Sequence, residues 1–366
     1  MFLRSQNVLM NQLDLSDVAF IDDVLYNEMK RTQVQPGDVL INITGASIGR
    51  VAPFDLDGRR ANVNQHVCII RPKKDALDFR YLACYLSSHR FQDTIDRLQR
   101  GGTRQALTFD MIADFDIPLP PLPEQRRITT ILDKADAIRR KREEGIRLTE
   151  ELLRSIFMEM FGDPVRNENH WPIVRVQDAG EVQLGRQRAP QFQTGKHTRP
   201  YVRVANVFED RIDFSDLLSM DFDPSDFATY RLRHGDLLLN EGQSTELVGR
   251  PAMWREEITD CCFQNTLVRF RSDLEKTVPE FALEVFLFYL RSGQFARISS
   301  KTSNVAHLGA GRFAEMPFPL PPLGLQQAYA EQREKIWLLL EQRRRLHQDS
   351  NVLFGSLVQR AFRGEL

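Results

Sequence analysis

The chain has 366 residues, 42% of them hydrophobic and 27% charged, which is typical of a globular protein with room for two domains. Its formal net charge is -1, from 49 basic and 50 acidic residues. This balance excludes nucleic-acid binding through an overall positive charge, so any DNA-binding surface must come from local clusters of arginine and lysine.

Nothing in the sequence predicts a membrane protein or a metal site. The start, MFLRSQNVLMNQ, lacks the apolar core of a signal peptide, and the longest apolar stretch, residues 281–290, is interrupted by Glu284. The seven histidines stand singly, without metal-ligand spacing. Four cysteines without CxxC spacing are expected to be reduced thiols in a cytoplasmic protein: Cys68, Cys84, Cys261 and Cys262. We expect no cofactor.

Short strands and turns are predicted first along the chain. Pro36-Gly37-Asp38 opens a β-rich run that reaches Asn42, and Gly49-Arg50 closes the turn after it. A helical stretch is predicted near residues 81–91, and the proline-rich residues 118–122 end this first globular part.

A long helix is predicted from Glu124 to about Phe161, because this stretch has no proline and only one interior glycine, Gly145. Its apolar residues recur close to a heptad: Ile128, Leu132, Ala135, Ile146, Leu153, Ile156 and Met160. So narrow a stripe favours a coiled-coil seam, on a helix roughly 55–60 Å long.

The same landmarks return in the same order after about two hundred residues. His234-Gly235-Asp236 opens a second β-rich run to Asn240, and Gly249-Arg250 closes its turn. The remaining matches are Gln65 with Gln264, Leu86-Ser87-Ser88 and Phe91 with Leu290-Arg291-Ser292 and Phe295, and residues 118–122 with 319–323. A second helix carries the stripe Ile336, Leu339, Leu346, Leu353 and Leu357. Such agreement in register indicates a duplicated module.

The two copies differ at the front. About thirty residues of the second copy, Trp171 to Pro200, have no counterpart in the first, where Ser5-Gln6-Asn7 matches Val204-Ala205-Asn206. Either the start codon was assigned too late or the first domain is truncated. We expect an α+β fold with similar globular domains at residues 1–119 (incomplete) and 166–319, and long helices at residues 120–165 and 320–366.

Over essentially its whole length the chain resembles the DNA-specificity (S) subunits of type I restriction–modification systems. The resemblance is carried by Ile117 to Ile131 (IPLPPLPEQRRITTI), the Gly-Asp strand motifs, Phe161-Gly162-Asp163 and the closing Leu357 to Leu366. The second boundary departs from it, since Gly324-Leu325-Gln326 stands where the first has Pro123-Glu124-Gln125. That departure puts in doubt a role for the glutamate.

The resemblance implies a non-catalytic subunit that binds double-stranded DNA. Two target-recognition domains would each grip one half of a split site, and the two helices would pack antiparallel and set the spacer length. Two methylation (M) subunits would supply S-adenosylmethionine chemistry on a flipped adenine, and restriction (R) subunits would cleave foreign DNA. Three alternatives stay open: a stand-alone methyltransferase or nuclease, a coiled-coil adaptor without DNA reading, and a truncated, decayed S subunit. The first lacks support, because no DPPY or NPPF sequence and no nuclease triad is present.

Three kinds of segment are candidates for DNA contact, each with an ordinary surface loop or turn as the competing interpretation. The stretch from Gln183 to Phe208 has no acidic residue and carries Arg186, Arg188, Lys196, Arg199 and Arg203. The polar turns after the Gly-Asp strands carry Asn42, Thr44, Ser47 and Arg50, and Asn240, Gln243 and Ser244. The loops after the domain helices carry Arg97, Arg100, Thr103 and Arg104, and Lys301 and Asn304.

Two further motifs favour a structural interpretation. The run from Arg139 to Arg142 is predicted to be a solvated helix face, because Glu143-Glu144 follows it. Phe161-Gly162-Asp163-Pro164 is predicted to be a glycine helix end rather than a methyltransferase motif.

Overall fold

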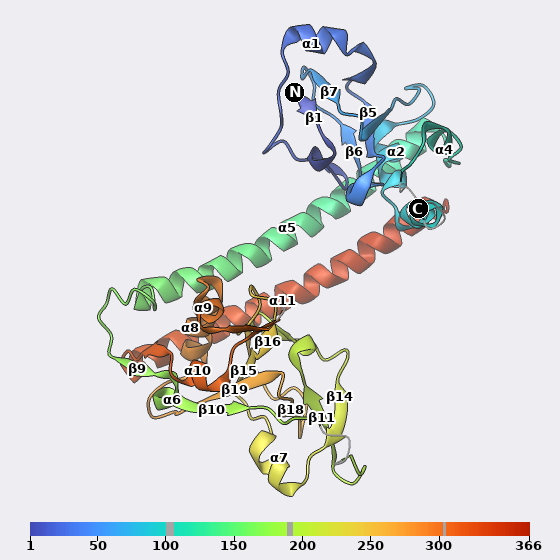
Figure 1. The fold of residues 1–366 in the computed structure, drawn as a ribbon. Helices are drawn as coiled ribbons and strands as arrows, with labels where there is room; N and C mark the ends of the chain where they lie inside the picture. Colours follow the sequence, from blue (N-terminus) through green and yellow to red (C-terminus); the bar gives the residue numbers. More distant parts are fainter. Residues whose placement is uncertain (100–105, 189–192, 303–304) are drawn as a thin grey trace. The chain divides into compact units, whose positions relative to one another are not determined.

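A computed structural model describes residues 1–99, 106–188, 193–302 and 305–366 (Figure 1). The chain forms two compact units. Unit 1 consists of residues 1–145 and 343–366, and unit 2 of residues 146–342. In the part that the structure describes, no helix is both long and apolar enough to cross a bilayer.

Unit 1 is built from short strands, short helices and parts of two long helices. Its elements are β1 (Phe2–Leu3), β2 (Val8–Leu9), β3 (Gln12–Leu13), α1 (Asp23–Glu28), β4 (Gln33–Val34), β5 (Asp38–Asn42), β6 (Val51–Phe54), β7 (Ala61–Val63), β8 (Val67–Ile70), α2 (Phe79–Leu86), α3 (His89–Gln99) and α4 (Phe109–Ala113). The central sheet has the order β6-β5-β8, and smaller sheets have the orders β1-β7-β4 and β2-β3.

Unit 2 repeats this arrangement and adds elements at its front. It contains β9 (Ile173–Arg175), α6 (Val176–Ala179), β10 (Gly180–Leu184), β11 (Thr198–Val202), β12 (Val207–Phe208), β13 (Arg211–Ile212), β14 (Leu218–Asp221), α7 (Pro224–Tyr230), β15 (Leu237–Asn240), β16 (Gly242–Gln243), β17 (Pro251–Met253), β18 (Cys262–Phe263), β19 (Leu267–Ser272), α8 (Pro279–Arg291), α9 (Gln294–Ile298), β20 (Ser300–Thr302), β21 (Val305–His307), α10 (Ala310–Ala314) and β22 (Pro317–Pro319). Its central sheet has the order β10-β19-β15-β17, with β15 in the place of β5 and β19 in the place of β8.

In both units the aspartate of the Gly-Asp motif is buried and paired with an arginine. Asp38 is buried, accepts from Arg71 at 2.7 Å and also accepts from the backbone N–H of Gln35. Asp236 is buried in the same way, and Arg271 is its partner at 2.7 Å. A buried carboxylate needs such a partner, so the motif fixes the start of each central strand. This predicted correspondence is confirmed.

One predicted match is wrong by one residue. The N–H of Asn64 donates to Leu3 and that of Gln264 donates to Val202, at the same place beside the first sheet of each unit. Gln264 therefore corresponds to Asn64, and not to Gln65. Identical residue type in adjacent positions misled the comparison.

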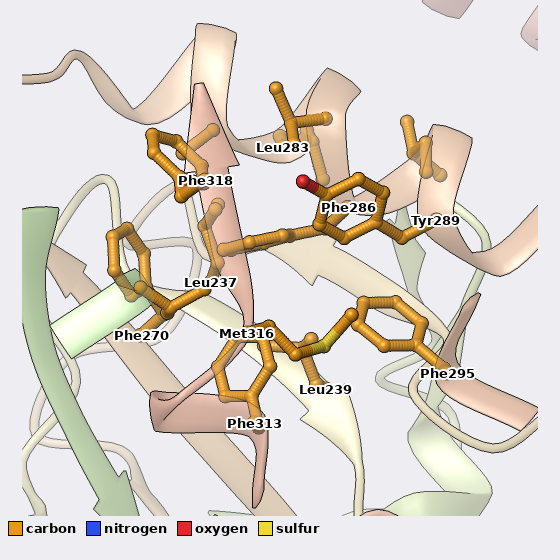
Figure 2. Close-up of a cluster of buried hydrophobic side chains, with 14 of the residues drawn as sticks. Leu237, Leu239, Phe270, Leu283, Phe286, Tyr289, Phe295, Phe313, Met316 and Phe318 are labelled. Carbon is orange, nitrogen blue, oxygen red and sulfur yellow. The ribbon is translucent and has the colours of Figure 1, made fainter. Parts of the chain in front are cut away.

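The core of unit 2 lies between the central sheet and α8. Leu237 and Phe270 of the sheet pack with Phe286 of the helix (Figure 2). Phe313 and Phe318 also pack on Phe286, with ring centroids 5.1 and 5.8 Å away. Phe270 and Phe286 meet edge to face, with ring centroids 5.2 Å apart. Unit 1 has the smaller version of this core, around Val39, Leu82 and Phe91.

The two long helices are α5 (Leu122–Phe161) and α11 (Leu323–Ala361), and both contribute to both units. In unit 1 they run antiparallel, as three contacts show: Arg127 with the Leu366 carbonyl, the Arg139 guanidinium over the Phe354 ring, and Arg142 with the Leu346 carbonyl. In unit 2, Phe157 and Phe161 pack on Tyr329. The predicted pair of long antiparallel helices is confirmed.

The first turn of each long helix contains a buried glutamine. Gln125 accepts from the N–H of Asp78 and donates to the carbonyls of Ala76 and Pro120. Gln326 makes the equivalent bonds, accepting from the N–H of Val278 and donating to Lys276 and Pro321. The glutamine is the shared residue of the two boundaries, whereas Glu124 only pairs with the half-exposed Arg127.

Candidate nucleic-acid interface

In unit 2, the turn after β15 and the segment after α9 form one small sheet. β16 pairs with β21, and β21 pairs with β20, in the order β16-β21-β20. This pairing brings Gln243 and Ser244 into the same layer as the exposed Lys301. Two of the predicted candidate segments, about sixty residues apart in the chain, are thus one surface.

Glu241 fixes this surface. Its carboxylate lies 2.9 Å from Nδ1 of His307 and accepts from the N–H of Gly309 at 3.3 Å. Its backbone N–H donates to Thr266, and its carbonyl accepts from Leu308. The sequence comparison missed Glu241 and His307, because their counterparts in unit 1 are the unrelated residues Ile43 and Ala106.

Among the described residues of unit 1, which do not include 100–105, one β-bridge joins the corresponding segments. Thr44 pairs with Ala106, and the N–H of Leu107 donates to Ile43. Thr44 Oγ1 lies 2.6 Å from Nδ1 of His66. On this turn Arg50 is exposed and Ser47 is half-buried. A histidine therefore contacts the turn in both units, but His66 lies just before β8, whereas His307 lies in β21.

The loop after α3 is described only in part. Arg97, predicted to lie in this loop, instead lies in the last turn of α3, where it is exposed and its Nε donates to the Asp93 carbonyl at 3.1 Å. Arg100, Thr103 and Arg104 lie outside the described residues, as does Asn304 in unit 2.

The basic stretch of unit 2 contains a loop before β11, residues 193–197, which Asp221 of β14 holds in place. This carboxylate accepts from the N–H groups of Thr194 and Gly195, at 2.5 and 2.6 Å, and from the hydroxyl of Thr198 at 2.9 Å. Burial opposes the charge, but these hydrogen bonds outweigh it and lower the pKa of Asp221 to about 2. The exposed Lys196 lies in this loop, which is therefore held by an ionised carboxylate.

The other basic residues of this stretch differ in whether they are exposed or already paired with a carboxylate. Arg188 and Arg199 are exposed, and the Arg199 guanidinium lies 5.1 Å from the centre of the Phe227 ring. Arg186 instead pairs with Asp226, and Arg203 pairs with Asp216. An arginine already neutralised by a carboxylate is a poorer phosphate ligand, since the pair must first separate.

Asn42 and Asn240 lie inside the protein rather than on the turns. Both are fully buried, and Asn42 donates to the carbonyls of Ser5 and Val8. The glycine after each turn donates its N–H to the asparagine carbonyl, Gly49 to Asn42 and Gly249 to Asn240. These asparagines shape the turns, and their burial removes them from the set that can reach DNA without rearrangement.

One structural interpretation is confirmed in part and one in full. Arg140 and Lys141 are exposed, and Arg140 pairs with Asp136 of the same helix, as expected of a solvated face. Arg139 and Arg142 instead face α11, because Arg139 lies over the Phe354 ring and Arg142 donates to the Leu346 carbonyl. α5 ends at Phe161, and Gly162 has a φ of 73° with its N–H donating to Met158. A left-handed glycine at this point is a helix end.

No group of three or more histidine, cysteine, aspartate or glutamate side chains in the described ranges is arranged to hold a metal ion. The cysteines there are free thiols, and burial raises the pKa of Cys68 to about 11. A thiol with so high a pKa is a poor nucleophile.

Comparison with known proteins identifies relatives of one kind. Residues 11–148 match the family described as the type I restriction modification DNA specificity domain. The EcoKI specificity subunit of Escherichia coli K12 is 22% identical over all of this chain and 82% of its own length. The StySPI specificity subunit of Salmonella potsdam is 20% identical over the same shares.

Two solved structures share the fold. A chain from a type I restriction–modification assembly aligns over all of this chain and 91% of its own length, with a TM-score of 0.52 and 18% identity. The S subunit from M. genitalium aligns over 91% of this chain and 84% of its own length, with a TM-score of 0.56 and 14% identity. Both alignments cover nearly the whole chain, and therefore both units and both long helices.

Proposed function

Because the chain belongs to the specificity subunits of type I restriction–modification systems, we propose that each unit reads one part of a split DNA site. The reading surface is the turn after the Gly-Asp strand together with the segment that pairs with this turn. A specificity subunit determines which DNA sequence the complex acts on, and catalysis lies in its partner subunits.

One observation supports this surface most directly. In both units the fold joins the turn to the segment that follows the domain helices, through Thr44 and Ala106 in unit 1 and through β16 and β21 in unit 2. The sequence comparison had chosen these segments separately. Their exposed or half-buried side chains can donate to and accept from base edges: Thr44, Ser47, Arg50, Gln243, Ser244 and Lys301.

The basic loop before β11 and the start of β11 supply sequence-independent affinity. Lys196, in the loop that Asp221 fixes, and Arg199, on β11, are exposed cations, with Arg188 nearby in sequence. Such residues bind phosphates and position a protein on the duplex without reading its sequence.

The subunit acts in the cytoplasm as part of a larger complex. Two M subunits assemble on it and modify an adenine in each half of the site, and R subunits add cleavage of unmodified foreign DNA. The chain itself carries no S-adenosylmethionine or ATP.

The test separates phosphate contacts from base contacts in the chain co-expressed with M subunits. Replacing Lys196 and Arg199 by alanine together should weaken binding to specific and unrelated DNA alike, and reduce the slope of log K against log salt by about 2. Gln243→Ala should instead reduce the preference for the specific site by about tenfold at unchanged slope. The control is Lys335→Ala, an exposed lysine of α11 outside the proposed surface. Equal behaviour of all three variants would contradict the proposal.

A further inference from the structure

The small sheet β16-β21-β20 of unit 2 has one face toward the core and one toward solvent. Ala306 of β21 is 1% exposed and packs in the core of this unit. Val305 and His307 alternate with it along the strand, so their side chains point to the other face, and Val305 is 41% exposed. Gln243 and Lys301 pair opposite Ala306, but they lie on the two edge strands, where they can still reach solvent.

His307 stands on the outward face with only small residues beside it. Gly242 pairs with it across β16 and β21, and Ser300 pairs with it across β20 and β21. Residues directly opposite each other in an antiparallel pair lie on the same face of the sheet. An added Cβ at Gly242 would lie 3.5 Å from Nδ1 and Cε1 of the ring, so the imidazole lies over this glycine. The His307 side chain is 39% exposed.

Glu241 determines which ring nitrogen of His307 carries a hydrogen. One carboxylate oxygen lies 2.9 Å from Nδ1, and the other accepts from the N–H of Gly309. A carboxylate only accepts hydrogen bonds, so Nδ1 is the donor and, in the neutral ring, Nε2 is an acceptor. Among the described residues none bonds Nε2, which leaves its lone pair available on the outward face.

The turn of unit 1 has no such constraint. There Thr44 Oγ1 lies 2.6 Å from Nδ1 of His66. A hydroxyl can donate or accept, so either nitrogen of that ring can carry the hydrogen. Ala106 stands at the position of His307 and pairs with Thr44. A ring acceptor fixed by a carboxylate is therefore a feature in which the two units differ.

We propose that His307 reads one base of the part of the site that unit 2 binds, accepting at Nε2 from an exocyclic amino group in the major groove. That group is N6 of adenine or N4 of cytosine, since guanine and thymine present no donor there. Glu241 is a positioning residue, because both of its oxygens are engaged within the protein. This inference rests on the proposed DNA reading and assigns part of it to one atom.

The main variant is His307→Asn, measured in the complex with M subunits. The asparagine amide can donate to Glu241 in place of Nδ1, but it has no atom at the position of Nε2. The DNA is the site found by methylation mapping, with each adenine in turn replaced by purine and each cytosine by 2-pyrimidinone, which lack the amino group. Binding is measured at about pH 8, where an ordinary imidazole is neutral.

We expect one position at which removal of the amino group weakens binding about fivefold more in the wild type than in His307→Asn. The identity of the sensitive analogue distinguishes adenine from cytosine. The lost Watson–Crick bond affects both proteins equally and cancels in this comparison. Lys335→Ala should behave as the wild type. Unchanged amide exchange at Leu308, whose N–H donates to the Glu241 carbonyl, verifies that the sheet is intact in each variant.

Glu241→Gln tests the role of the carboxylate. A glutamine whose oxygen still accepts from Gly309 presents its amide N–H to Nδ1, which moves the ring hydrogen to Nε2. Preference at the sensitive position should then shift from adenine to guanine, or from cytosine to thymine, because Nε2 has become a donor.

Equal losses in the wild type and His307→Asn at every position would overturn the proposal. So would a Glu241→Gln protein that loses affinity without changing its preference. A wild-type complex without any sequence preference would instead refute the proposed reading itself, and the role of His307 with it.

Discussion

The two units meet their long helices through opposite chemistry. In unit 2, Arg333 of α11 is 1% exposed, bonds Asp210 at 2.6 Å and lies 3.8 Å from Glu284. Arg255 also bonds Asp210, and its guanidinium lies 4.0 Å from the centre of the Trp337 ring. Unit 2 therefore anchors its helix with a buried network of charges.

Unit 1 has apolar packing at the same place. The helix positions that match through the two boundary glutamines are Leu132 and Arg333, and Leu132 packs with Tyr81 and Ile128. Asn11 replaces Asp210; both have positive φ, and their N–H groups donate to Val51 and Pro251. A hollow of about 210 Å³ remains beside Asn11, Cys84 and Leu132.

The same backbone arrangement therefore accommodates either a buried charge network or apolar packing beside the long helix. The residues at this place must then all be of the matching kind. Burial alone would raise the pKa of Asp210, but Arg333 and Arg255 outweigh it and lower the value. Burial raises the pKa of Glu284, against the opposing effect of Arg333 and Arg291. A complete buried charge network stabilises a protein little more than apolar packing does. Removing one of its charged residues is nevertheless strongly destabilising, because its former partner stays buried.

The largest expected effect breaks that network. Arg333→Leu removes the cation that the buried Asp210 and Glu284 share, leaving Arg255 beside Asp210 and Arg291 beside Glu284, and should destabilise unit 2 by about 3 kcal/mol. All three tryptophans, Trp171, Trp254 and Trp337, lie in unit 2, so tryptophan fluorescence during urea unfolding reports on this unit alone.

The matched control introduces into unit 2 the residue types that unit 1 has at the equivalent positions. Combining Arg333→Leu with Asp210→Asn and Glu284→Cys should restore part of the lost stability, because no buried carboxylate is left unpaired and Arg255 keeps its contact with the Trp337 ring. A single variant that loses less than about 1 kcal/mol would show that the network carries no such penalty.

The next effect compares the glycines that close the two turns. Gly249 has a φ of 77°, and an added Cβ would lie 2.4 Å from the ring of the buried Phe295. Gly49 has a φ of 83°, but there the nearest atom, at 2.8 Å, is the amide oxygen of Gln92, the end of a flexible side chain. Gly249→Ala should therefore cost about 3 kcal/mol and Gly49→Ala about 1–2 kcal/mol, measured by calorimetry of each variant. Equal costs would mean that backbone strain outweighs contact with the ring.

The smallest effect has the opposite sign. Gly355 lies inside α11, and an added Cβ would meet nothing within 4 Å. Gly355→Ala should stabilise unit 1 by about 0.5–1 kcal/mol, because alanine favours a helix interior. Gly145→Ala is the control, since its Cβ would meet Arg343 at 3.1 Å and part of the gain should be lost. Helical circular dichroism during thermal unfolding measures both, and a loss of stability in Gly355→Ala would argue against open space there.

Periodicity and repetition predicted much of the fold. The long helices were expected from Glu124 and from residue 320, and begin at Leu122 and Leu323. The Gly-Asp strands were recognisable because a buried aspartate needs a fixed partner. What the sequence could not reveal is chemistry that differs between the copies, such as Arg333 in one helix and Leu132 in the other.

The candidate site was predicted less well, for a physical reason. Residue type suggested Asn42 and Asn240 for base contacts, yet the same hydrogen-bonding groups serve the backbone when buried. Arg186 and Arg203 looked free because Asp226 and Asp216 lie outside the basic stretch and reach it only through folding. The pairing of β16 with β21 likewise joins segments that sequence distance keeps apart.

The glutamine at the start of each long helix has a mechanical consequence. Gln125 ties the first turn of α5 to the residues just before α2, and Gln326 ties α11 to those just before α8. Without these bonds, the proline-rich stretch could change its direction relative to the helix. With them, the start of each long helix is fixed to the domain beside it, so we expect that domain and that helix start to move as one body.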